Sequence, residues 1–323
     1  MRARDLVSRV AGIRILFLRA VSLFKTARGP VEVFSVLCFI LRYVESWVAP
    51  KVLRTAEATI RLQGAVYRVG LRGGESATFR EIYLDRQYDK LPDFIPRYGW
   101  TVLDIGANVG LYAVQSARRG AVVYAFEPSR ASYERLVYNV IDNGLSGRVT
   151  TSNCALGSRP GRGVVVSDGL TIHGQVQRIG HRSRQVPTAV EMTTLDRLVW
   201  RFGLARIDLM KIDVEGAEVE VLGGAIDALK AVDRIIVEYH STDLLEKVDQ
   251  FLLGCGYSLL LREETYPGQA LGLLYYAKRP TPVEGLAGSD NAGRGGSALD
   301  PQAWACLGED FCSRIFRPPN DKP

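Results

Sequence analysis

The sequence contains few of the residues that build disulfide frameworks or zinc sites. It has five cysteines and three histidines in 323 residues, with no Cys-x-x-Cys pair and no His/Cys grouping at zinc spacing. An odd, scattered set of cysteines favours a reducing compartment, so we expect a cytoplasmic protein. Cys306 and Cys312 could pair, although two free thiols are the simpler expectation for that compartment.

No apolar run approaches the length of about 20 residues that a membrane-spanning helix needs. The run at 33–41 is bracketed by Glu32 and Arg42, and arginines interrupt the first apolar run, where no signal-peptide cleavage pattern is found. Residues 1–54 carry ten Lys and Arg against three Asp and Glu, and their apolar residues fall near helical spacing. We expect a basic helical extension that caps the protein; peripheral contact with an anionic membrane and an oligomer contact are the alternatives.

The rest of the chain lacks an excess of positive charge. Residues 55–323 carry 31 Lys and Arg against 32 Asp and Glu, so nothing there favours nucleic acid as a partner. At the other end, Pro, Gly, Ser, Asn and Asp dominate residues 280–299. We therefore expect 280–323 to be a low-complexity and largely disordered tail.

The segment around which the chain is organised is 101–110, Thr-Val-Leu-Asp-Ile-Gly-Ala-Asn-Val-Gly. It reads as a short strand and a glycine turn, and a helical pattern follows from Leu111. Gly106 and Gly110 allow positive φ and let a ligand approach the backbone. The start of the helix offers free N–H groups to a polar ligand.

The next strand-like run, 121–126, ends at Glu127. A carboxylate at the tip of the second strand of a βαβ unit can accept hydrogen bonds from both hydroxyls of a ribose. The dinucleotide fingerprint Gly-x-Gly-x-x-Gly is missing, because Asn108 stands where a middle glycine would be. A nucleoside without phosphates, S-adenosylmethionine, therefore suits the pattern better than NAD.

Strand and helix patterns alternate over 99–279, which is typical of a doubly wound sheet. Strands are predicted at 101–105, 121–126, 148–154, 207–212, 234–239, 257–262 and 271–277, and helices at 129–143, 194–203, 215–230 and 242–254. The loop between the last two strands is too short for a crossover helix, so these strands must pair antiparallel.

Two other segments break this rhythm. Residues 55–98 read as a strand-rich lead-in, with a hairpin at Gly64. Residues 157–192 mix glycines and arginines with His173 and His181, and we expect irregular strands or a loop beside the site.

Three segments, in this order, resemble those of the FkbM-type S-adenosylmethionine-dependent methyltransferases. They are 102–110, then 125–128 with Leu136 and Asn139, then 207–218 with 221–225. The resemblance covers roughly Phe79 to Lys278. It implies an α/β, Rossmann-like class I methyltransferase fold: a mostly parallel seven-stranded sheet with an antiparallel last strand. It also implies S-adenosyl-L-methionine as the cofactor, and it places Tyr88 over the cofactor pocket, with a packing tyrosine as the alternative.

Ligands of such sheets bind at the carboxyl ends of the strands. The predicted cofactor-binding residues are Asp104, Gly106, Asn108, Gly110, Glu127 and Ala155. Asp104 would accept from the cofactor's ammonium or a bridging water, Glu127 from the ribose, and Ala155 would offer its backbone to the adenine. The alternatives are a turn-stabilising Asp104, a solvated Glu127 and plain packing at Ala155.

The predicted catalytic residues are Asp213, Glu238 and His240. Asp213 ends its strand, and alternation puts Glu238 and His240 on one side of theirs. A histidine beside a carboxylate is a credible base near neutral pH, although His240 could instead cap the following helix. We expect no metal, while noting that oxygen and imidazole ligands of this kind suit a divalent cation. For Glu215 and Glu218, the pattern favours helix capping.

Methyl transfer to a hydroxyl needs an in-line approach and a base for the released proton. By resemblance, the acceptor is a hydroxyl of a sugar, a glycolipid or a specialised metabolite. The alternatives are an NAD-dependent oxidoreductase and a methyltransferase-like module that binds a partner without turnover.

Overall fold

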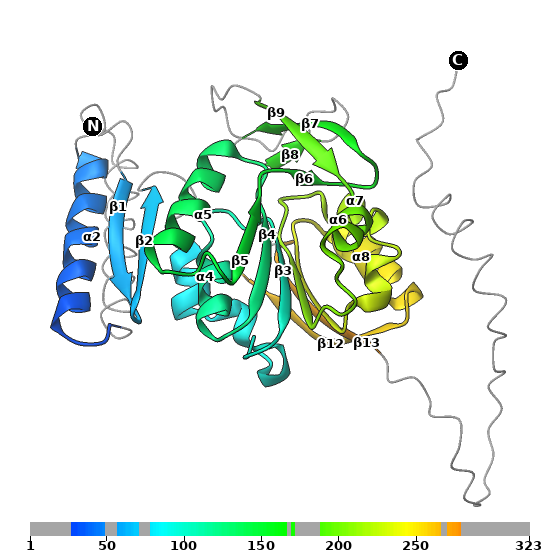
Figure 1. Cartoon of the computed structure of the whole chain (residues 1–323), viewed down its shortest axis with the longest axis horizontal. Helices are drawn as coiled ribbons and strands as arrows, with labels where there is room; N and C mark the ends of the chain where they lie inside the picture. The colour runs from blue at the N-terminus through cyan, green and yellow to red at the C-terminus, as the bar shows by residue number, and fades with distance from the viewer. Residues whose placement is uncertain are drawn as a thin grey trace, which may run out of the picture.

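Figure 1 shows the computed structural model of the chain. The structure describes residues 27–48, 57–70, 78–166, 169–171, 188–265 and 270–278. The expectations for the first 26 residues, for His173 and His181, and for the tail at 280–323 with its two cysteines lie outside these ranges.

The centre of the molecule is a seven-stranded sheet. Its strands are β3 (Thr101–Ile105), β4 (Val122–Phe126), β5 (Val149–Ser152), β10 (Leu209–Ile212), β11 (Arg234–Tyr239), β12 (Tyr257–Glu264) and β13 (Gly272–Lys278). Their order is β12-β13-β11-β10-β3-β4-β5, and β13 runs antiparallel to both of its neighbours while β5, β4, β3, β10 and β11 pair in parallel. The predicted strands and their mostly parallel arrangement are confirmed.

Helices cover both faces of this sheet (Figure 1). They are α4 (Leu111–Arg118), α5 (Arg130–Asp142), α6 (Leu195–Phe202), α7 (Glu218–Gly223) and α8 (Thr242–Gly254). Alternate strand residues point to opposite faces: Val102 packs in the same apolar core as α4 and α5, whereas Leu103 packs in a second core with α6, α7 and α8. Ser129, Thr194 and Ser241 cap the helix starts with their hydroxyl oxygens.

The helix predicted at 215–230 is shorter than expected. Glu215 and Gly216 both have positive φ, at 53° and 106°, so the chain turns in the left-handed region before α7 begins. After α7, a separate 3₁₀ turn spans Ala228–Ala231. Two loop residues therefore stand where the pattern placed the first helical turn.

The lead-in segment forms a hairpin of β1 (Glu57–Leu62) and β2 (Ala65–Gly70), packed against α2 (Pro30–Val48) at one side of the molecule (Figure 1). Gln63 and Gly64 both have positive φ, as a two-residue hairpin turn of this hand requires. Asn139 of α5 ties β2 to the main body through its side-chain hydrogen bonds to the backbone of Arg68. The predicted hairpin is confirmed, and it is joined to the sheet layer by buried amide contacts.

The outward face of α2 exposes Val31, Phe34, Leu37 and Leu41. In the part of the chain that the structure describes, every helix is too short or insufficiently apolar to cross a membrane. Contact of this region with an anionic membrane stays a prediction.

A smaller sheet lies beyond the end of β5. It consists of β6 (Ala155–Leu156), β7 (Gly161–Val166), β8 (Gly169–Thr171) and β9 (Thr188–Thr193), in the order β6-β9-β7-β8. Short strands therefore occupy the described parts of the glycine-rich segment. Before the central sheet, a π-helical turn (Arg80–Leu84) and two 3₁₀ turns (Gln87–Asp89, Pro92–Phe94) lead into β3.

Candidate active site

The conformation and close packing of the turn after β3 depend on two glycines, Gly106 and Gly110. Gly106 has a φ of 76°, and a Cβ at this position would stand 1.7 Å from the carbonyl oxygen of Asp213. Gly110 has a φ of 81°, and its Cβ would stand 2.3 Å from a methyl carbon of Leu136. Close packing against the loop after β10 and against α5 therefore requires both glycines. The turn and the Asp213 loop are built against each other.

Glu127 follows β4 and closes the same turn. Its Oε2 accepts the Asn108 N–H at 2.8 Å, and its Oε1 accepts the Ser129 N–H at 2.7 Å. Burial raises the pKa of Glu127 to about 7, although the two N–H donors oppose this. A carboxylate oxygen has two lone pairs, so each oxygen can accept a second hydrogen bond. The residues present thus fit a ribose diol.

Asn153 supports this arrangement from the end of β5. Its side-chain amide donates to the carbonyl oxygens of Glu127 at 2.8 Å and Pro128 at 3.1 Å. Ala155, by contrast, is buried in β6, where it pairs with Met192 of β9. Its backbone contact with an adenine stays a prediction.

Lys211 is a buried cation at the centre of the site. Its Nζ lies 3.2 Å from Asp104 Oδ1, 3.1 Å from the Gly106 carbonyl oxygen and 3.2 Å from Asp213 Oδ2. Burial favours the neutral amine, but Asp104 and Asp213 outweigh it and raise the pKa of Lys211. The sequence pattern contained this lysine without assigning it a role. The local signal is a lysine inside the short, otherwise apolar strand Leu209–Ile212, which marks Lys211 as buried without naming its partners.

Asp104 is fully buried, so Lys211 is its immediate partner. Burial raises the pKa of Asp104, and Lys211 opposes that shift. The second carboxylate oxygen has no partner among the described residues. The cofactor role of Asp104 stays a prediction.

Tyr88 lies between the candidate catalytic carboxylates. Its hydroxyl is 2.9 Å from Glu238 Oε2 and 3.1 Å from Asp213 Oδ2, and one proton can be donated to only one of them at a time. The ring packs edge-on against Tyr112, with the centroids 5.1 Å apart. Burial and the nearby Asp213 raise the pKa of Glu238 above its ordinary value. Tyr88 is therefore a packed residue that also links two acids of the site.

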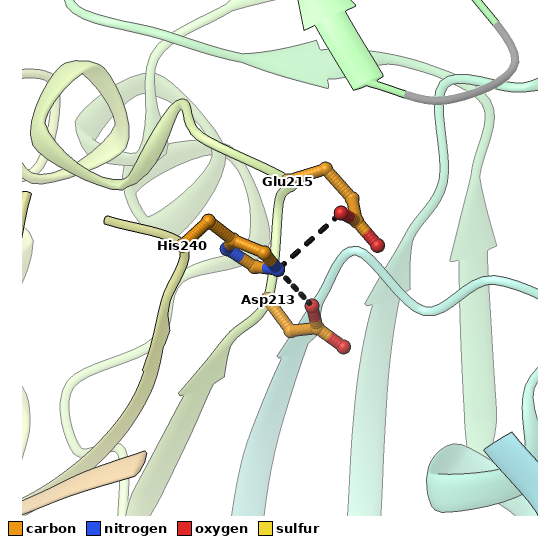
Figure 2. Close-up of side chains that lie close together, drawn as sticks. All are labelled: Asp213, Glu215 and His240. Atoms are coloured by element: carbon orange, nitrogen blue, oxygen red, sulfur yellow. Dashed lines mark ion pairs between the residues drawn. The ribbon is translucent and has the colours of Figure 1, made fainter. Parts of the chain in front are cut away.

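His240, at the end of β11, is surrounded by carboxylates (Figure 2). Its Nδ1 lies 2.7 Å from Glu218 Oε1, and its Nε2 lies 3.3 Å from Glu215 Oε2 and 4.0 Å from Asp213 Oδ1. Burial lowers the pKa of His240, but Glu218 and the other two carboxylates raise it to about 10. The cap of α8 is Ser241, so capping does not explain His240.

The structure thus brings Asp213 and His240 together through two glutamates that the sequence pattern assigned to helix capping. Glu238 Oε2 lies 2.9 Å from the Tyr88 hydroxyl, which also reaches Asp213. Sequence reasoning also missed Glu81, in the π-helical turn. Burial and Asp213 raise the pKa of Glu81 to about 7. Nothing in the local sequence marks Glu81, because only the packing of its turn brings it near the strand ends.

The strand order, the glycine turn and the acid at the tip of β4 define a Rossmann-like class I methyltransferase fold. Residues 104–259 match the methyltransferase FkbM domain. This region of the chain is therefore a methyltransferase domain of the FkbM type.

Several curated proteins are similar to this chain. The 31-O-demethyl-FK506 methyltransferase FkbM of Streptomyces tacrolimicus is 27% identical over 64% of this chain and 91% of its own length. The hexuronic acid methyltransferase AglP of Haloferax volcanii is 25% identical over 65% of this chain and 83% of its own. The AMB antimetabolite synthetase AmbE of Pseudomonas aeruginosa is 28% identical over 74% of this chain, which spans only 13% of that relative.

Among solved structures, M. jannaschii TYW2 in complex with AdoMet aligns over 70% of this chain and 88% of its own, with 14% identity and a TM-score of 0.39.

Proposed function

We propose that this methyltransferase uses S-adenosylmethionine to methylate a hydroxyl group of a sugar, a glycolipid or a specialised metabolite. Glu127 carries the proposal for the cofactor. Its two oxygens are fixed by backbone donors 19 residues upstream and two residues downstream, and each keeps a lone pair for a ribose hydroxyl. The names of two relatives support the acceptor class, since one specifies an O-position and the other a hexuronic acid.

Asp213 is the group best placed to receive the proton of the acceptor hydroxyl. Its Oδ2 is held by Lys211 and Tyr88, and its Oδ1 lies 4.0 Å from His240 without a hydrogen bond in the described part of the chain. Of the three predicted catalytic residues, Asp213 is the most exposed, at 23% of its side chain, whereas Glu238 is buried. The carboxylate therefore has one oxygen fixed and the other open.

When bound, S-adenosylmethionine supplies an electrophilic methyl group. The hydroxyl oxygen forms the new C–O bond as the C–S bond breaks and its electron pair stays on sulfur. Asp213 Oδ1 accepts the hydroxyl proton, while Lys211 and Tyr88 hold the other oxygen in place. One oxygen of Asp213 is therefore held in place, and the other orients the acceptor hydroxyl and removes its proton.

Calorimetry of the full chain with S-adenosylhomocysteine tests the cofactor assignment. We expect saturable binding by the wild type and a loss of about 1.5–3 kcal/mol of binding free energy in Glu127→Ala, because two charge-assisted hydrogen bonds disappear. Glu246→Ala, an exposed change in α8, is the matched control and should bind normally. Equal affinity in wild type and Glu127→Ala would refute the ribose assignment.

Acceptors are then screened with S-adenosylmethionine carrying a labelled methyl group. We expect label on a hydroxyl oxygen of a glycan, glycolipid or small metabolite, and greatly reduced transfer in Asp213→Asn with S-adenosylhomocysteine binding retained. A folded wild type that binds NAD and no S-adenosylhomocysteine would instead support an oxidoreductase. Binding of neither ligand would support a module without turnover.

A further inference from the structure

Three potential ligand atoms converge beside the loop after β10: Asp213 Oδ1, Glu215 Oε2 and His240 Nε2 (Figure 2). They come from two segments, the turn after β10 and the end of β11, and all lie within 4.8 Å of one another. Ligand atoms at about 2.1–2.3 Å from one divalent cation stand about 3.0–3.5 Å apart. The observed separations of 3.3 and 4.0 Å from Nε2 need only small side-chain shifts to reach that geometry.

The imidazole is already held as a metal ligand would be. Histidines that bind metals almost always donate their other N–H to a carboxylate, a carbonyl or a water, which fixes the tautomer and the ring orientation. Here Glu218 Oε1 lies 2.7 Å from Nδ1 of His240 and also accepts the Gly216 N–H at 3.0 Å. Glu218 is completely buried, and its Oε2 has no partner among the described residues. With Nδ1 engaged, the Nε2 atom of His240 is directed at Asp213 and Glu215, and a cation that binds there displaces the Nε2 proton to solvent.

The backbone at Glu215 places its carboxylate in the cluster. Glu215 has a φ of 53°, in the left-handed region that a glutamate rarely occupies. Such conformations cost free energy and persist where the surrounding structure enforces them, commonly at functional sites. The turn removes Glu215 from α7 and brings its carboxylate over His240, although 61% of the side chain is exposed.

We propose that Asp213, Glu215 and His240 bind one divalent cation of the Mg²⁺ or Mn²⁺ type, positioned by Glu218. The inference rests on the proposed function, because this site lies at the carboxyl ends of β10 and β11, beside Asp213. Carboxylates and an imidazole are ligands that such cations accept, and three protein ligands leave positions for water and substrate. An acceptor hydroxyl would take one open position.

A hydroxyl oxygen bound to the cation loses its proton more readily, because the positive charge stabilises the alkoxide. With the cation bound, Asp213 Oδ1 is a ligand and the hydroxyl proton passes to water; without the cation, Asp213 Oδ1 accepts that proton, as in the proposed function. The acceptor oxygen still forms its bond to the methyl carbon as the C–S bond breaks. A second hydroxyl next to the first would bind the same cation, so the site favours acceptors with neighbouring hydroxyl groups.

The test is a titration of the metal-free full chain with MnCl₂, followed by electron paramagnetic resonance of free Mn²⁺. We expect one Mn²⁺ per chain, displaced by excess Mg²⁺. Glu215→Gln should weaken binding at least about tenfold because a charged ligand is lost, and Glu218→Gln should weaken it by about 10–100-fold as a positioning change. Glu246→Gln, the matched change on α8, should leave the affinity unchanged. Unchanged S-adenosylhomocysteine affinity in each variant shows that the fold is intact.

Two results would overturn the proposal: no bound Mn²⁺ in the wild type, or the same affinity in wild type, Glu215→Gln and His240→Ala. The cofactor titration without metal separates this failure from that of the proposed function. S-adenosylhomocysteine bound without Mn²⁺ refutes the cation site alone. If the wild type binds Mn²⁺, Glu215→Gln loses that binding, and S-adenosylhomocysteine does not bind, the cation site is supported and the proposed function is refuted.

Discussion

Replacing Lys211 with methionine removes the buried cation on which two acids of the site depend. The Nζ atom lies 3.2 Å from both Asp104 and Asp213, and the lysine side chain is only 4% exposed. Methionine has a similar length and no charge, so the change keeps most of the packing. It leaves the completely buried Asp104 with neither its ion pair nor access to water.

The expected loss of unfolding free energy is large. Removing one partner of a buried ion pair typically costs about 3–5 kcal/mol, because the remaining charge stays buried without compensation. Lys247→Met gives the scale for a surface pair: Lys247 lies 2.8 Å from Asp243 on α8, and the two side chains are 46% and 70% exposed. Such exposed pairs contribute about 0.3–0.5 kcal/mol. The two lysine variants should therefore differ by several kcal/mol.

Urea unfolding followed by circular dichroism measures both variants. Adding Asp104→Asn to Lys211→Met should recover part of the loss, because the orphaned carboxylate then becomes neutral. If Lys211→Met loses no more stability than Lys247→Met, or if the added Asp104→Asn lowers stability further, the buried-pair reasoning is refuted.

Three further predictions concern the turn, the lead-in and the ribose acid. Gly106→Ala should lose roughly 2–4 kcal/mol of unfolding free energy, since its Cβ would meet the Asp213 carbonyl oxygen. Gly144 also has a positive φ but lies in open space, so Gly144→Ala should lose only about 1 kcal/mol. Equal losses in the two variants would contradict the clash. Asn139→Ala should lose about 2–3 kcal/mol in urea unfolding, because its buried amide makes three backbone hydrogen bonds, and a neutral effect would refute its tethering role. S-adenosylhomocysteine should bind more weakly at pH 6 than at pH 8. With a pKa of about 7, the Glu127 carboxyl is mostly neutral at pH 6 and has one acceptor oxygen fewer. An affinity that calorimetry finds independent of pH would contradict this.

The central sheet could be predicted because each strand is a short apolar run bounded by residues that favour turns. Gly106 and Gly110 mark the first turn, and each predicted strand boundary lies within two residues of the observed one. The helix prediction at 215–230 was wrong at both ends, since α7 spans only Glu218–Gly223. A helix pattern cannot show that Glu215 takes a left-handed conformation, since that depends on the loop packing against Gly106.

The sequence by itself determined the fold class, the family and the strand ends that carry Asp104, Glu127, Asp213 and His240. Local patterning suffices for these, because a parallel sheet places every such end at one edge. Only the tertiary structure decided which groups meet there.

Alternation along β11 suggested that Glu238 accompanies His240, and the charge of His240 does act to lower the pKa of Glu238. The carboxylates nearest the imidazole, however, are Glu215 and Glu218. Lys211 likewise became the centre of the site only when β10 paired with β3 and placed it opposite Asp104. These contacts join residues more than 20 positions apart, and they depend on strand register and on one left-handed turn, which no local sequence pattern specifies.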